Sequence, residues 1–318
     1  SFVDINGNPG LDMHSNTTDL SSVFYDKTAP AVVSLSFTSD NEVSQYHANT
    51  GHLLSINLET DEAIEDPELI IGGSSIEIAG GDRVWAGSYT VTDTDPEGIV
   101  PFSISLKDLA GNSYEGITST IDGSSMTIDR TAPSITGVGI SSSNAYDSSL
   151  AIPGNVVLIS FTTDEPVPVP EVIISGTVAQ ISGSEKSWIA SRTMSDSDAN
   201  GEIIFSISFS DFASNDGGEV VTTTDSSQIF YDKTVPEITF LSVLSDNEFT
   251  SSIATAGDSV TIMFQASESI QYPSVQIGGK EVSVDTSDVD DLTGAVSWVA
   301  SRAMDWEDDE GVLDFRVD

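Results

Sequence analysis

Acidic side chains in this sequence recur at a fixed spacing of 103 residues. Three glutamates and three aspartates keep this spacing: Glu62, Glu165 and Glu268, and Asp26, Asp129 and Asp232. Each of the three aspartates is followed by a basic residue, threonine, alanine or valine, and proline, so it stands directly before a short linker. Carboxylates that are repeated in this way can bind one divalent cation per repeat.

Two more groups of acids follow the same repeat. Asp108 and Asp211 are each followed four residues later by an asparagine, and Asp4 shows the same pattern. A glycine-containing loop with paired acids occurs in every repeat, and its candidate ligands are Asp93, Asp95, Asp196, Asp198 and Asp308. Because acids at the strand ends of a β-sandwich gather at its poles, we expect these side chains to meet where one domain follows another.

Calcium is the cation that this chemistry favours. It takes about six to eight oxygen ligands in flexible geometry, and carboxylates are prominent among them. Bound calcium would also offset part of the negative charge of the chain. A second interpretation needs no metal, because Asp and Asn before glycine are ordinary turn formers whose side chains hydrogen-bond to their own backbone. The paired acids do not follow the EF-hand signature, and both interpretations stay open at this point.

Other kinds of site find no support in the residues. The sequence has no cysteine, which excludes disulfides, thiolate metal sites and a cysteine nucleophile. Its three histidines, His14, His47 and His52, do not recur between repeats, and no nucleophile elbow or phosphate-binding loop is present. We therefore predict a protein that is not an enzyme, with no catalytic residues and no organic cofactor.

The charge of the chain narrows the choice of partners. The 318 residues include 10 Lys and Arg against 51 Asp and Glu, which gives a net charge of −41. Such a field repels nucleic acid and anionic membranes, so we predict no nucleic-acid partner and no direct insertion into a membrane. A hydrophobic content of 38%, with 13 Phe and 4 Trp, favours packed cores over a disordered acidic chain.

The fixed repeat indicates one folding unit that is copied in tandem. The linker motif ends at Pro30, Pro133 and Pro236. We predict four parts: the C-terminal part of a preceding Ig-like repeat (1–26), two complete Ig-like repeats (27–129 and 130–232) and a C-terminally incomplete Ig-like repeat (233–318). Because this window is out of phase with the repeat, we expect the chain to be a segment of a much longer polypeptide. Proline restricts each linker, so we also expect stiff junctions.

Short β-strands account for the pattern inside each repeat. In the second complete repeat, runs rich in Val, Ile, Phe and Thr are separated by Gly, Pro, Asn, Asp and Ser, and they span 134–140, 155–162, 171–175, 187–194, 202–209 and 228–231. No window of this repeat has a sustained helical period. Six or seven strands in about 100 residues predict an all-β fold, made of tandem Ig-like antiparallel β-sandwich domains in a linear array.

Three tryptophans occupy corresponding places in the repeats. Trp85, Trp188 and Trp298 each lie in a predicted strand, and we interpret them as core anchors. The interval from Trp188 to Trp298 is about seven residues longer than that from Trp85 to Trp188, which indicates an insertion in the third repeat. Loops that connect strands tolerate such insertions well. We place that insertion in the acidic stretch 285–294.

These residues together resemble the bacterial Ig-like tandem repeats of large extracellular adhesins and cell-surface proteins. The resemblance rests on the Asp-Lys-Thr-Ala-Pro linker, the strand that ends in Phe161–Pro166, the tryptophan-containing strand and the Asp-Leu-Ala-Gly-Asn segment at 108–112. It covers essentially the whole chain. It implies an extracellular or cell-surface location and calcium-stiffened junctions, with the three recurrent glutamates and the Asp-x-Asp loops as candidate calcium ligands.

The sequence departs from that pattern at two positions. Ser267 stands where the other repeats have Asp61 and Asp164, and Val235 replaces alanine in the third linker. The first change removes an acid from a position next to a candidate ligand. It therefore puts the third calcium site in question.

The resulting hypothesis is a non-enzymatic extracellular structural protein. Its repeats would be a segment of a long array that forms a surface filament, sheath or appendage. The alternative is the monomeric calcium-stiffened stalk of a large cell-surface adhesin. The expected partners are neighbouring repeats of the same chain and, in a filament, identical chains. A carbohydrate-binding module is disfavoured, because Tyr46, Tyr114 and Tyr146 are scattered rather than gathered on a platform.

Overall fold

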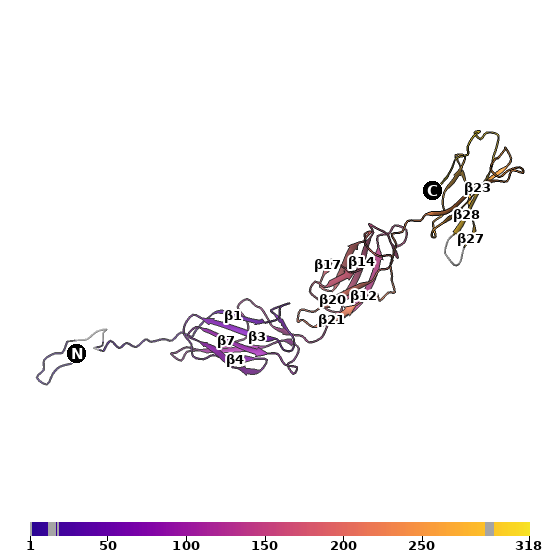
Figure 1. Ribbon diagram of the computed structural model, residues 1–318. Coiled ribbons are helices and arrows are strands. Elements are labelled where there is room, and N and C mark those ends of the chain that lie inside the picture. The colour runs from indigo at the N-terminus through magenta and orange to yellow at the C-terminus, as the bar shows by residue number, and fades with distance from the viewer. Residues whose placement is uncertain (1, 12–16, 18, 290–295) are drawn as a thin grey trace. The chain divides into compact units, whose positions relative to one another are not determined.

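The computed structural model describes residues 2–11, 17, 19–289 and 296–318, and these residues contain strands but no helix (Figure 1). Among them, accordingly, no helix is long and apolar enough to cross a membrane. The chain divides into two compact units, Ser1–Asp232 and Lys233–Asp318. The first unit contains two separate hydrophobic cores and the second contains one. The all-β fold of tandem antiparallel sandwiches expected from the sequence is confirmed.

The first sandwich packs two four-stranded antiparallel sheets face to face. One sheet has the order β1 (Val32–Ser39), β3 (Leu53–Thr60), β7 (Val84–Thr90) and β6 (Ile78–Gly81). The other has the order β10 (Ser113–Ile117), β9 (Phe102–Lys107), β4 (Glu68–Ile71) and β5 (Ser74–Ile76). A small third sheet joins β2 (His47–Ala48), β11 (Thr127–Ile128) and β8 (Gly98–Ile99).

The second sandwich repeats this topology strand for strand. Its first sheet has the order β12 (Ile135–Ser142), β14 (Val156–Thr163), β18 (Ser187–Thr193) and β17 (Gln180–Ser184). Its second has the order β16 (Thr177–Val178), β15 (Glu171–Ile174), β20 (Phe205–Ser210) and β21 (Asp216–Val220). Its small sheet joins β13 (Leu150–Ala151), β22 (Phe230–Tyr231) and β19 (Gly201–Glu202).

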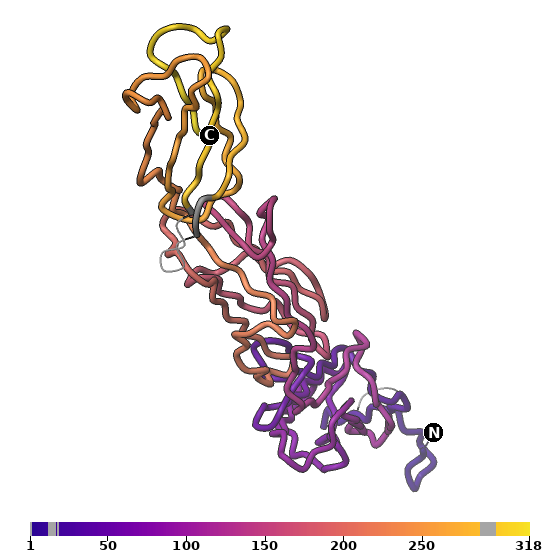
Figure 2. The backbone as a smooth tube through the Cα atoms, turned by 90° about the vertical axis from the view of Figure 1, so that its right-hand side faces the viewer, coloured from indigo at the N-terminus to yellow at the C-terminus, as the bar shows by residue number. Residues whose placement is uncertain are grey.

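The second unit, Lys233–Asp318, contains the corresponding first sheet and part of the second. The order is β23 (Ile238–Ser245), β24 (Ser259–Ala266), β28 (Val296–Ala303) and β27 (Val284–Val289) in one sheet, and β26 (Lys280–Val282), β25 (Val275–Ile277) and β29 (Phe315–Val317) in the other. The path of this unit can be followed in yellow and orange in Figure 2. Of the stretch 285–294 in which the insertion was placed, residues 285–289 belong to β27 and residues 290–294 lie outside the described residues.

Alternation along the strands builds each core. On β20 and the residues before it, the side chains of Ile203, Phe205, Ile207 and Phe209 are all buried, as their period of two predicts. On β18 the same rule buries Trp188 and leaves its neighbour exposed. The three recurrent tryptophans are 3–5% exposed, which confirms that they anchor the cores.

A glycine opposite each of the first two tryptophans has a steric reason. Gly183 has φ of 131°, and a Cβ there would lie 2.2 Å from the carbonyl oxygen of Ser187 and 2.9 Å from the Cα of Trp188. Gly80 has φ of 158° and meets the same clash against Val84 and Trp85. No other residue fits this close approach of the two strands of the hairpin.

The antiparallel rule has two short exceptions in the described part of the chain. β11 pairs with β2, and β22 with β13, in parallel over two residues each. β11 and β22 come last in their repeats, directly before the linker aspartate. The pairing fixes the linker aspartate, because the backbone N–H of Asp129 donates to Ala48 O at 2.9 Å and that of Asp232 donates to Ala151 O at 2.9 Å.

Candidate metal centre

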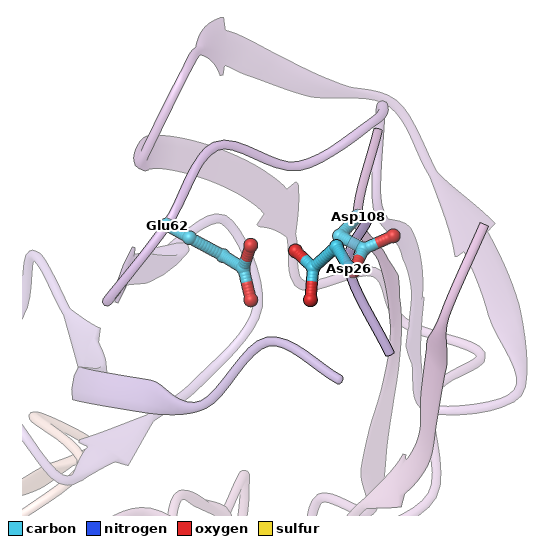
Figure 3. Close-up of side chains that lie close together, drawn as sticks. All are labelled: Asp26, Glu62 and Asp108. Carbon is cyan, nitrogen blue, oxygen red and sulfur yellow. The ribbon is translucent and has the colours of Figure 1, made fainter. Parts of the chain in front are cut away.

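Six of the predicted acids form two matching clusters. The first acid cluster consists of Asp26, Glu62 and Asp108, and the second of Asp129, Glu165 and Asp211. In each cluster, one carboxylate oxygen per residue can be chosen so that all three oxygens lie within 4.8 Å of one another. Figure 3 shows the first cluster, with the carboxylates of Glu62 and Asp26 facing each other and Asp108 next to Asp26. Each cluster could hold a metal ion.

Each cluster combines acids from two consecutive repeats. Its glutamate follows the second long strand of a sandwich, β3 or β14, and its buried aspartate follows β9 or β20. The third acid comes from the end of the repeat before, directly ahead of the proline linker. The cluster therefore lies where the linker enters a sandwich, which is the pole that the sequence pattern indicated.

Hydrogen bonds hold the glutamate backbone in place. Thr60 and Thr163 end their strands, and their Oγ1 hydroxyls donate hydrogen bonds to the backbone carbonyl oxygens of Glu62 and Glu165, at 2.7 and 2.6 Å. Both threonines are buried, so the turn after the strand is fixed from inside the sandwich.

The recurrent pairing of a buried aspartate with an asparagine four residues later is explained by hydrogen bonds between the two residues. Asn215 donates from its backbone N–H to Oδ1 of Asp211 at 2.8 Å and from its side chain to Oδ2 at 2.7 Å. Asn112 makes the same two bonds to Asp108, at 2.8 and 2.7 Å. The turn-former interpretation is thus correct for these aspartates, and it coexists with their place in the clusters.

The linker aspartate also caps its own turn. Oδ1 of Asp129 accepts the backbone N–H of Thr131 at 3.0 Å, and Oδ1 of Asp26 accepts that of Thr28 at 3.0 Å. One carboxylate oxygen thereby fixes the threonine that stands two positions before the proline. The other oxygen is the one that this capping bond leaves available to a cation.

The serine at 267 keeps the structural role of the acid that it replaces. Oδ1 of Asp164 accepts the backbone N–H of Ser134 at 2.8 Å, and Asp61 accepts that of Ala31 at 2.7 Å. Oγ of Ser267 accepts the N–H of Glu237 at 2.9 Å in the same place. These acids therefore anchor the strand after the linker, and their replacement by serine removes no member of a cluster.

Crowding of negative charge is visible in the pKa of the cluster glutamates. Burial raises the pKa of Glu165 above its usual value of 4.5, and the nearby Asp129 and Asp211 raise it further. Burial and then Asp26 and Asp108 act in the same direction on the pKa of Glu62. Burial also acts to raise the pKa of Asp108, but the hydrogen bonds from Asn112 outweigh it and lower that pKa. The charged form of the glutamate in each cluster is therefore disfavoured in the absence of a counter-ion.

This crowding predicts how stability depends on pH when a chelator keeps divalent cations away. Because the folded-state pKa of Glu165 is raised, the folded protein binds this proton more tightly than the unfolded chain does. The destabilisation is absent below the ordinary carboxyl range and is complete once pH exceeds the raised value. Glu165→Gln should therefore raise the Tm in chelator at pH 7, and this gain should vanish as pH falls below about 4. A Tm for this variant that stays below that of the original protein at pH 7 would contradict the prediction.

The geometry of the clusters suits calcium. Calcium–oxygen bonds are about 2.3–2.6 Å long, so two oxygens on one ion can be up to about 5 Å apart. The 4.8 Å limit within each cluster meets that condition. Three carboxylates supply three ligands with a formal charge of −3, and carbonyl oxygens and water would have to supply the remainder. With no cysteine in the chain, a thiolate-preferring metal is a poor match.

The aspartates of the paired-acid loops do not belong to the two acid clusters. Asp93, Asp95, Asp196, Asp198 and Asp308 belong to neither cluster among the described residues. Asp95 accepts hydrogen bonds from Tyr89 Oη at 2.7 Å and from the backbone N–H of Thr92 at 2.6 Å. The pairing of these loops with the recurrent glutamates, expected from the sequence, is not seen in the described structure.

Arginine side chains, which were not predicted as partners, hold the aspartates of two of these loops. Arg192 donates to Oδ1 of Asp198 at 2.5 Å, with side chains only 11% and 8% exposed. Burial acts to raise the pKa of Asp198, but this bond and that from Ser195 N–H outweigh it and lower the pKa. Arg302 pairs with Asp308 in the same way. The signal in the sequence was an arginine four residues after the core tryptophan in both repeats.

Asp232 and Glu268, the third pair of recurrent acids, lie in different compact units. Oε1 of Glu268 is buried and accepts no hydrogen bond from the described residues. A buried carboxylate oxygen without a donor is costly unless a cation or water satisfies it.

Comparisons with known proteins do not identify a family for this chain. No family model matches the chain, and no curated protein matches it. Among solved structures, it is similar to the crystal structure of dimeric latent PorU from Porphyromonas gingivalis, at 9% sequence identity and a TM-score of 0.23. The match covers 91% of this chain and 32% of that chain. A likeness this distant carries no argument, and the resemblance to bacterial Ig-like repeats stays a prediction.

Proposed function

We propose that this protein is a non-enzymatic extracellular structural protein whose tandem sandwiches are joined by calcium. The observation that supports it most is the composition of the acid clusters. Each one combines the last aspartate of one repeat with a glutamate and a buried aspartate of the next. A cation bound by all three would tie consecutive repeats together and neutralise the charge that crowds the junction.

An extracellular or cell-surface location fits this chemistry. Sites in extracellular modules bind calcium with dissociation constants of about 10⁻⁴–10⁻³ M, which serve only where the ion is abundant. A chain with no cysteine gains no stability from disulfides, so bound cations are an alternative source of stability. The net charge of −41 also favours a setting in which divalent cations collect on the surface.

The array would serve as part of a surface filament, sheath or appendage in which identical chains are partners. A monomeric stalk that holds a distant domain of an adhesin away from the cell is the alternative. Calcium-bound junctions would suit either role, because both need repeats that resist bending. The two roles differ in whether the chains associate with one another.

Small-angle scattering of the 318-residue chain in millimolar calcium and then in chelator tests the proposal. We expect the distribution of the maximum dimension to be narrower in calcium than in chelator, because chelator removes the bridging ion and leaves only direct contacts to hold a junction. Sedimentation at rising protein concentration separates the two roles, since only the filament predicts association. Identical scattering curves in both buffers would contradict calcium-dependent junctions.

A further inference from the structure

The pole of the first sandwich carries a group of polar and aromatic side chains that contact a loop of the second. Asn41 and Asn49 lie on either side of β2, which contains His47. The loop that they meet is 212–215, directly after Asp211, and we call it the pole loop. All of these residues belong to the unit Ser1–Asp232.

Asn41 uses its full hydrogen-bonding capacity at this contact. Its Nδ2 donates to the carbonyl oxygens of His47 at 3.0 Å and of Phe212 at 2.9 Å. Its Oδ1 accepts the backbone N–H of Val43 at 2.9 Å and Oγ of Ser214 at 2.7 Å. Two of these four bonds hold its own turn and two reach the second sandwich. The side chain offers two donors and two acceptor positions, so none is left unused.

Two further contacts extend the interface. The rings of His47 and Phe212 lie 5.6 Å apart between centroids at an angle of 33°. Asn49 donates to Oδ1 of Asn215 at 3.3 Å, and Nδ2 of Asn215 donates in turn to the carbonyl oxygen of Asp129 at 3.0 Å. The pole loop is therefore bound to the first sandwich at both of its ends.

The repeats themselves supply a comparison for this contact. Asn144 occupies the position equivalent to Asn41 and makes the same turn, in which its Oδ1 accepts a backbone N–H at 2.9 Å. Asn144 is nevertheless only half-buried, whereas Asn41 is 5% exposed. Leu109 is equivalent to Phe212 and is 72% exposed, whereas Phe212 is 37% exposed. Folding of the sandwich alone therefore does not bury these positions, and the contact between the repeats does.

We propose that Asn41, His47 and Asn49 form a docking surface that is specific for the pole loop of the following repeat and holds it without a metal ion. At this junction the rings of His47 and Phe212 lie next to each other. The other repeats have aliphatic residues at both positions: Leu150 and Ile253 correspond to His47, and Ile5 and Leu109 correspond to Phe212. This difference gives a physical reason why His47 does not recur. It also lets one junction be distinguished from another. The proposal goes beyond the calcium-binding function and does not depend on it.

The experiment measures hydrogen exchange of the Asn41 side-chain NH₂ group by NMR, in the 318-residue chain with chelator present. Ser214→Gly removes the hydroxyl that donates to Asn41. It should not strain the loop, because Ser214 has φ of 69° and its equivalent Gly111 has φ of 95°. We expect exchange to become roughly two- to tenfold faster, as for the loss of one hydrogen bond. Asn41→Ala should in turn speed exchange of the Asn215 side chain.

Two controls separate docking from general loss of stability. The side-chain NH₂ of Asn112, which bonds only within the first sandwich among the described contacts, should exchange at an unchanged rate in both variants. Asn144→Ala should leave exchange at Asn215 unchanged. Unprotected Asn41 in the original protein, or equal changes at Asn112, would overturn the proposal. Protection that exists only in calcium would also overturn it, while leaving the calcium proposal intact.

Discussion

Trp188→Ala is expected to lower the free energy of unfolding of the second sandwich by about 3–5 kcal/mol, the range for removing a large buried aromatic side chain. The indole is 5% exposed, lies opposite Phe161 in the neighbouring strand and donates from Nε1 to Glu185 O at 3.2 Å. Its removal leaves a cavity in the hydrophobic core of the second sandwich. Hydrogen exchange of β14 amides measures this loss within the second sandwich alone.

The adjacent residue provides the matched control. Ile189 lies on the same strand with its side chain pointing to the other face, and it is 47% exposed. Ile189→Ala should therefore cost well under about 1 kcal/mol. Similar losses for the two variants would mean that Trp188 does not anchor the core. The β3 amides of the first sandwich should be unaffected by either change.

Glu165→Gln is expected to weaken calcium binding at the second acid cluster by about 10- to 100-fold, because calcium affinity follows the number of charged ligands. The first acid cluster does not contain this residue, so its affinity should not change. Titration by calorimetry should thus show one site lost or displaced to much higher calcium concentration. Glu171→Gln is the matched control, since Glu171 is an exposed carboxylate on β15 outside both clusters.

In chelator, Glu165→Gln should have the opposite effect on the stability of the folded protein. Opposite effects in the two buffers would identify Glu165 as a calcium ligand. Without calcium, the same substitution removes a charge that burial and then the neighbouring aspartates disfavour, and it should stabilise the folded protein at pH 7. With calcium, it removes a ligand and should reduce the stabilisation that the ion provides. If Glu165→Gln left calcium affinity unchanged, the second acid cluster would not be a calcium site.

The strands and cores were predictable from the sequence because their signals are local. Alternation along 202–209 fixes which side chains are buried, and the repeat of 103 residues transfers that result to the other sandwiches. The short parallel strands at the poles were not predictable, since β2 and β13 have two residues each. Such a short segment has no period of its own, and tertiary context alone decides its partner.

The candidate site was predictable in part for the same reason. Fixed spacing identified all six residues of the two acid clusters, because each lies at a strand end or linker that the repeat places at a pole. The paired-acid loops also recur in the repeats, but their residues Asp95, Asp198 and Asp308 are held by Tyr89, Arg192 and Arg302. Composition alone does not distinguish a carboxylate paired with an arginine from one that faces other carboxylates. The docking of Asn41 on the pole loop joins residues over 170 positions apart, beyond any local pattern.

The most direct test of the central claim is a calcium titration of the 318-residue chain followed by amide chemical shifts. Calcium at the junctions predicts saturable changes at the backbone of residues 26, 62 and 108 and of residues 129, 165 and 211, with separate affinities for the two clusters. Residues 93–95 and 196–198 should shift little, because the carboxylate of Asp95 accepts a hydrogen bond from Tyr89 and that of Asp198 is paired with Arg192. Changes confined to those loops, or no saturable change anywhere, would contradict the account.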